Sequence, residues 1–89
     1  MSKISLPLYS SSLDLTGFTE NNKIVSQIGK AIRYHRNQMG MTQQEFSELM
    51  GFNRTYLSSI ERGERNISLI TLINISKYLD VSIVELVSF

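Results

Sequence analysis

The pattern of hydrophobic and polar positions divides the chain into an irregular leading segment and a helical remainder. Residues 1–21 hold the only proline and a run of three serines. Their apolar residues show no helical spacing: Ile4, Leu6, Leu8, Leu13, Leu15 and Phe18. We therefore expect residues 1–21 to form a flexible or loosely docked arm. The alternation from Ile4 to Leu8 is also typical of a strand, but Pro7 would confine such a strand to a sheet edge.

From Asn22 onward the apolar residues recur at helical spacing. The first stripe consists of Ile24, Ile28, Ala31, Ile32, His35 and Met39. Asn22 can cap the start of this helix, and Gly40 can end it. The pattern predicts a first helix from about Asn22 to about Met39.

Two short helical patterns follow, separated by a turn at Gly51. Thr42 and Glu45 have the spacing of a capping box, so they mark the start of the second helix. Its apolar residues share one face: Phe46, Leu49 and Met50. Gly51 can take the left-handed conformation that closes a helix.

The third predicted helix has a polar outer face. Asn53 can cap it, and Leu57 and Ile60 point inward. The opposite side carries Arg54, Thr55, Ser58 and Ser59. A helix with such a face can enter a major groove, so residues 42–62 predict a DNA-reading helix-turn-helix.

Two further helices complete the pattern. After a loop beyond Gly63, Ser68 caps a fourth helix that ends near Asp80. Its apolar positions are Leu69, Leu72, Ile73, Ile75 and Leu79. Ser82 and Glu85 form another capping-box pattern, which opens a short final helix. We expect an all-α, five-helix domain over residues 22–89.

Length and composition limit the classes of protein that fit. The chain has 89 residues, enough for one small domain, and 42% of them are hydrophobic. It has no cysteine, so disulfides and thiolate metal sites are excluded, and one histidine cannot assemble a zinc site. His35 lies on the apolar stripe, where a core or boundary position is expected. The sequence shows neither a signal-peptide pattern nor a membrane span, so we expect the protein to work in a reducing cytoplasm. We expect no cofactor.

Charge is distributed unevenly along the chain. The formal net charge is +1, but residues 23–66 carry seven basic and four acidic side chains, a net +3. The rest of the chain has a net charge of −2. This polarisation favours one face toward a polyanion, although a solvated charge pattern would also produce it.

Residues from Ile24 to Val87 resemble the phage repressor and Cro-type helix-turn-helix family. In that motif Gln43 is the first residue of the second helix, Ser47 lies where the two helices approach, and Gly51 forms the turn. The family most often has alanine at the position of Ser47, and serine is nearly as small. The resemblance implies a compact repressor-like domain that binds DNA.

The run RTYLSSIERGERNISL is more narrowly similar to the controller proteins of bacterial restriction-modification systems. That resemblance implies a homodimer on paired operators upstream of its own gene and the endonuclease gene. Such regulators activate at low occupancy and repress at high occupancy, with RNA polymerase as a further partner. The 21-residue leader is longer than the family usually carries.

The outer face of the third helix supplies the candidates for base recognition. A guanidinium at Arg54 can donate two hydrogen bonds to guanine O6 and N7, although a phosphate clamp is the alternative. Thr55 and Ser59 can each contact a thymine methyl group, a base edge or a phosphate.

The candidates for DNA backbone contact are Gln43, Tyr56, Ser58, Arg62, Arg65 and Asn66. Gln43 begins a helix, where phosphates bind, so phosphate contact is favoured; an ordinary first-turn residue is the alternative. The ring of Tyr56 can pack over the second helix while its hydroxyl reaches a phosphate. Packing alone is the alternative, and the resemblance favours contact. Phosphate contact is favoured for Arg65 and Asn66 over Arg62. The alternative for all three is that they are solvated loop residues.

Two other groups are assigned structural roles. The resemblance implies that Arg36 and Glu61 pair to join the first helix to the third. The apolar C-terminal residues exceed what one small core needs and predict a dimer interface: Leu79, Ile83, Leu86, Val87 and Phe89. Core packing is the alternative for some of them. A two-fold dimer would place its recognition helices about 34 Å apart, on a pseudo-palindromic operator.

These observations favour a sequence-specific transcriptional regulator. The alternative is an antitoxin-like or phage-type repressor that binds a protein partner through its leading segment and regulates its own gene. An enzyme is disfavoured, because the chain has no phosphate loop and no carboxylate cluster with metal-site spacing. No small-molecule substrate and no membrane partner are expected.

Overall fold

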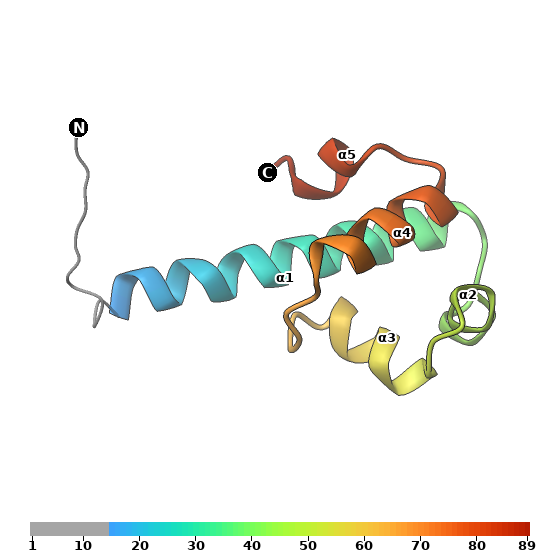
Figure 1. Ribbon diagram of the computed structural model, residues 1–89, viewed down its shortest axis with the longest axis horizontal. Helices are drawn as coiled ribbons and strands as arrows, with labels where there is room; N and C mark the ends of the chain where they lie inside the picture. The colour runs from blue at the N-terminus through green and yellow to red at the C-terminus, as the bar shows by residue number, and fades with distance from the viewer. Residues whose placement is uncertain (1–14) are drawn as a thin grey trace.

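The computed structural model describes the backbone of residues 15–89 and the side chains of residues 22–89. This part of the chain is all-α, as predicted, with five helices: α1 (Leu15–Gln38), α2 (Gln43–Met50), α3 (Arg54–Glu61), α4 (Leu69–Leu79) and α5 (Ile83–Val87). Helices α4 and α5 lie on one side of α1, and α2 and α3 lie on the other (Figure 1). The possible strand near Pro7 lies outside the described residues.

Helix α1 is longer than its apolar stripe predicts. It begins at Leu15, so Asn22 lies inside the helix and the predicted cap at Asn22 is wrong. An apolar stripe marks where a helix packs, and the backbone can continue as helix beyond the packed part. The N-terminal part of α1 accordingly extends past the other helices (Figure 1). Its C-terminal stop is as expected, with Gly40 at a φ of 73°.

The shorter helices begin and end at the predicted caps. Thr42 and Glu45 form a complete capping box, and Gly51 closes α2 in the left-handed conformation. The side chain of Asn53 accepts a hydrogen bond from the backbone N–H of Thr55. The hydroxyls of Ser68 and Ser82 cap α4 and α5 by accepting from the backbone N–H groups of Thr71 and Glu85. Of the capping box predicted at Ser82 and Glu85, only this half is formed. The two helices of the motif are therefore set by local sequence.

The core lies where the inward faces of all five helices meet. Its buried hydrophobic residues are Ile32, Phe46, Leu57, Ile60, Leu72, Ile75, Leu79 and Leu86. Four residues of the predicted apolar stripes are exposed: Ile24, Met39, Leu49 and Leu69. Helix α2 packs through Phe46 and Ser47, so Leu49, two positions further along, turns outward. Met39 lies beyond the last residue of α1.

Helices α1 and α3 approach closely at Gly29, a position that the apolar pattern does not reveal. A Cβ atom on Gly29 would lie 2.4 Å from the backbone oxygen of Ile60. Gly63, just after α3, similarly lies against the backbone of Ser26. The absence of side chains at these two glycines lets α3 lie directly on α1. Across residues 15–89, none of the helices has the length and apolar character needed to cross a bilayer.

Candidate nucleic-acid interface

The outward surface of α3 is polar and open to solvent. Leu57 and Ile60 are buried against the core, whereas Arg54 and Thr55 are exposed at the start of the helix. The capped turn from Gly51 to Asn53 presents this end of α3 beside α2. Among residues 22–89, nothing covers Arg54 and Thr55 of the predicted recognition face, whereas Ser58 is half-buried.

A buried ion pair fixes the far end of α3 to α1. Nε of Arg36 donates to Oε2 of Glu61 at 2.7 Å, and Nη2 donates to Oε1 at 2.9 Å. The third donor, Nη1, reaches the backbone oxygen of Met41 at 2.7 Å. Both side chains are almost completely buried, with 7% and 2% of their surface exposed. The geometry is bidentate, and each of the three guanidinium nitrogens donates one hydrogen bond, which helps to offset the burial of the charges.

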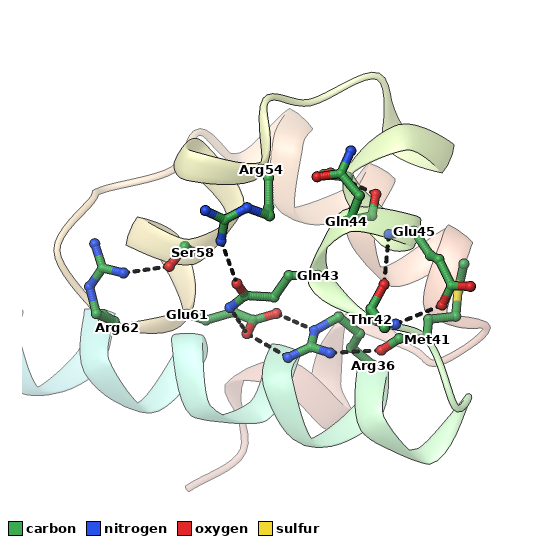
Figure 2. A network of polar contacts seen from close by, with 11 residues as sticks. Arg36, Met41, Thr42, Gln43, Gln44, Glu45, Arg54, Ser58, Glu61 and Arg62 are labelled. Carbon is green, nitrogen blue, oxygen red and sulfur yellow. Dashed lines mark hydrogen bonds and ion pairs between the residues drawn. The ribbon is translucent and has the colours of Figure 1, made fainter.

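Gln43 connects this ion pair to the exposed recognition surface (Figure 2). Its amide nitrogen donates to Oε1 of Glu61 at 3.0 Å, on the same carboxylate that Arg36 holds. Its amide oxygen accepts a hydrogen bond from Nη1 of Arg54 at 3.3 Å. A chain of polar contacts thus runs from the interior to the guanidinium of Arg54. Sequence reasoning placed Gln43 at the interface but did not foresee this bridge.

A second charged cluster lies on the surface at the end of α3. Nε of Arg62 donates to Oε2 of Glu64 at 2.9 Å, and Nη2 donates to Oε1 at 3.0 Å. Nη1 of Arg62 also donates to the hydroxyl of Ser58 (Figure 2). The hydrogen bond from Arg62 and its positive charge lower the pKa of the Glu64 carboxyl. Two of the predicted backbone contacts, Ser58 and Arg62, are therefore already engaged with each other.

An aromatic group supports the loop that follows α3. The ring of Tyr56 meets the ring of Phe52 edge-on, with centroids 5.1 Å apart. The guanidinium carbon of Arg65 lies 5.0 Å from the centroid of the Tyr56 ring, a cation–π arrangement. Tyr56 is half-buried, whereas Arg65 and Asn66 are exposed. The ring therefore both packs and holds an exposed basic side chain.

Some predicted site residues are buried inside the described domain. Ser59 is buried, and its hydroxyl donates to the backbone oxygen of Tyr56 at 2.7 Å, so it does not share the open face with Arg54. Leu79 and Leu86 belong to the core. Ile83 packs partly against the core, while Val87 and Phe89 are exposed. The predicted dimer-interface residues therefore form two groups: buried residues of the core, and residues that reach the surface.

Comparison with known proteins is consistent with this geometry. A helix-turn-helix family model matches residues 32–86. The control protein C.SmaI of Serratia marcescens is 38% identical over 61 residues, which cover 68% of this chain and 73% of that protein. The control protein C.BamHI of Bacillus amyloliquefaciens is 38% identical over 69 residues, covering 76% and 85%.

A solved structure of a controller protein is also similar to this chain. The restriction-modification controller protein C.AhdI from Aeromonas hydrophila superimposes with a TM-score of 0.66 at 32% identity. The superposition covers 70% of this chain and 94% of that protein. The shared region is the helical domain described above.

Proposed function

The chain belongs to the helix-turn-helix family of DNA-binding transcription regulators, and from this we propose that it is a dimeric controller protein of a restriction-modification operon. It binds operator DNA at its own promoter by inserting α3 into the major groove. The observation that carries this proposal is the open polar face of α3, whose first residue, Arg54, is tied through Gln43 to a buried ion pair. Such a regulator acts in the cytoplasm, contacts RNA polymerase and catalyses no reaction.

Arg54 and Thr55 read the bases in this proposal. A guanidinium carries five N–H donors, and Gln43 uses one of them, so a bidentate contact to guanine remains available to Arg54. Thr55 presents both a hydroxyl and a methyl group on the same exposed turn. Ser59 is left out of base recognition because its hydroxyl is already bonded within the helix.

The DNA backbone is held on both sides of α3. Gln43 uses one of two amide hydrogens on Glu61, so the other can reach a phosphate. Arg65, supported by Tyr56, and Asn66 contact a phosphate beyond the end of the helix. Arg62 joins them once its bonds to Glu64 open. Phosphate contacts fix the orientation of α3, and base contacts supply the sequence preference.

The dimer forms through exposed apolar residues at the C-terminus. Val84, Val87 and Phe89 are 60%, 40% and 61% exposed, and Ile83 borders them. Because Leu79 and Leu86 fill the core, their role in the interface is to support this surface from within. A two-fold arrangement of these surfaces places two copies of α3 on a pseudo-palindromic operator.

Operator selection from random duplexes, followed by binding of the Arg54→Ala variant, tests the proposal. We expect the variant to lose preference at one operator position per half-site, a difference of about 1–3 kcal/mol. Its thermal midpoint should remain unchanged because Arg54 is exposed. Lys77→Ala, which removes an equal charge from α4, is the matched control and should bind normally. Failure to select any preferred duplex, or an unaltered preference in Arg54→Ala, contradicts this mechanism.

A further inference from the structure

The described surface includes an apolar groove between α1 and the loop that precedes α4. Val25 and Ile28 of α1 line one side, and Ile67 lines the other. Ile60 and Leu72, both buried, lie at its base, and the exposed Arg65 borders it. The aliphatic side chains on both sides are half-buried in the domain as described. Covering this groove would remove further apolar surface from water.

We propose that residues 1–14 of the same chain turn back along α1 and cover this groove with Leu6 and Leu8. The segment lies outside the described residues and joins α1 at Leu15. Val25 is ten residues into the helix, or about 15 Å from Leu15 at 1.5 Å per residue. Leu8 is seven residues before Leu15, a reach of about 23 Å when extended. The segment is therefore long enough to bring Leu8, and then Leu6, to the groove.

The segment also has the side-chain pattern that a shallow apolar groove requires. In an extended chain alternate residues share a face, so Ile4, Leu6 and Leu8 form one apolar side. Ser5 and Pro7 fall on the other side. Proline is compatible with an extended chain that packs by side chains, because no backbone hydrogen bond from Pro7 is needed.

The segment and one side of the groove occur together in this chain. The family match begins at residue 32, so residues 1–14 and the α1 side of the groove both precede it. Val25 and Ile28 lie on the part of α1 that leads into the bundle, next to the segment in sequence. Because α1 forms one side of the groove, the segment directly before α1, residues 1–14, is a suitable occupant.

A spin label near the proposed contact tests this directly in the full chain. The protein has no cysteine, so Ser5→Cys provides a unique attachment site. We expect the methyl NMR signals of Ile28, Ile67 and Leu72 to lose most of their intensity in the labelled chain. The methyl signals of Leu49, on α2, serve as the internal reference and should keep their intensity.

Two controls separate the proposal from other occupants of the groove. Adding Leu6→Ser and Leu8→Ser to the labelled chain should restore the three signals without altering the reference. Mixing spin-labelled chains with separately isotope-labelled chains reports contact between molecules. Signal loss of equal size in the mixture assigns the groove to a second copy and overturns the proposal, as does full intensity in the singly labelled chain. These readouts need no DNA, so their failure is distinct from failure of the proposed function.

Discussion

Two arginine–glutamate pairs lie at the end of α3. They have the same bidentate geometry but opposite environments. In the Arg36–Glu61 pair the side chains are 7% and 2% exposed, and in the Arg62–Glu64 pair they are 54% and 56% exposed. The first joins α3 to α1 across 25 residues of sequence, and the second joins residues two positions apart. The distances from the arginine Nε to the glutamate Oε2, 2.7 and 2.9 Å, are nearly equal.

The comparison shows that burial, rather than geometry, decides what each pair does. Removing one partner of a buried pair leaves a charge in a medium that solvates it poorly. Water and salt replace a lost partner at the surface. We therefore assign Arg36–Glu61 to the fold, and we infer that Arg62–Glu64 controls Arg62, a side chain proposed to contact DNA.

The largest expected effect is that of Glu61→Gln. The change retains the shape of the side chain but leaves the buried guanidinium of Arg36 without its counter-charge, at a cost of about 3–5 kcal/mol. Urea unfolding followed by circular dichroism measures this loss. Glu64→Gln is the matched control at the exposed pair and should leave the unfolding midpoint nearly unchanged. Equal destabilisation by the two variants contradicts the comparison.

A smaller loss of stability is expected for Gly29→Ala, at the contact that brings α3 against the same helix. The new Cβ would lie 2.4 Å from the Ile60 oxygen and 2.8 Å from the Glu61 oxygen, so the helices must separate. Overpacking of this kind costs about 1–3 kcal/mol. The change should also disturb the buried pair, because Glu61 belongs to the contact. Gly40→Ala is unsuitable as a control because its φ is positive. The difference in stability between Gln27→Gly and Gln27→Ala, at an exposed position of α1, reports the effect of helix propensity.

The helix-turn-helix could be predicted from the sequence because its limits are encoded locally. Thr42, Gly51 and Asn53 each act on backbone groups within a few residues, and these contacts are present in the structure. The start of α1 at Leu15 was not predicted, because no apolar stripe runs through residues 15–21. Helical spacing alone predicts that Leu49 faces inward. Which face of a short helix packs against the core depends on the neighbouring helices, and α2 buries Phe46 and Ser47 instead.

The polar contacts within the site depended on tertiary structure. The closeness of Gly29 to Ile60 and the bridge from Gln43 to Glu61 join residues 31 and 18 positions apart. No local pattern specifies such pairs. The Arg36–Glu61 pair was accessible only through resemblance to a family. Ser59 is buried by the packing of α3, and its hydroxyl bonds within its own helix, which competes with its predicted role at the DNA.

Glu64→Gln should strengthen DNA binding while leaving the fold intact. The substitution weakens the hold on Arg62, whose guanidinium is then available to a phosphate. One additional phosphate contact steepens the dependence of log affinity on log salt by about 0.9. Salt titration of operator binding measures this slope. Asp80→Asn, at the end of α4, removes an equal charge and should leave the slope unchanged; an equal change in both variants would reduce the effect to net charge.

The smallest effect is the pH dependence of the exposed pair. The pKa of Glu64 is lowered in the folded protein, mainly by the hydrogen bond from Arg62, so the unfolded chain binds this proton more readily. The contribution of the pair is therefore present at neutral pH and is lost as the pH falls through the lowered pKa, while Arg62, whose pKa is raised, stays charged. Carboxyl NMR titration of Glu64 should give a pKa below that of an ordinary glutamate. The shift should disappear in Arg62→Gln and shrink in high salt, because both side chains are more than half exposed. A Glu64 pKa insensitive to both changes would mean that Arg62 is not its partner in solution, and the guanidinium would then be available to DNA without any competing carboxylate.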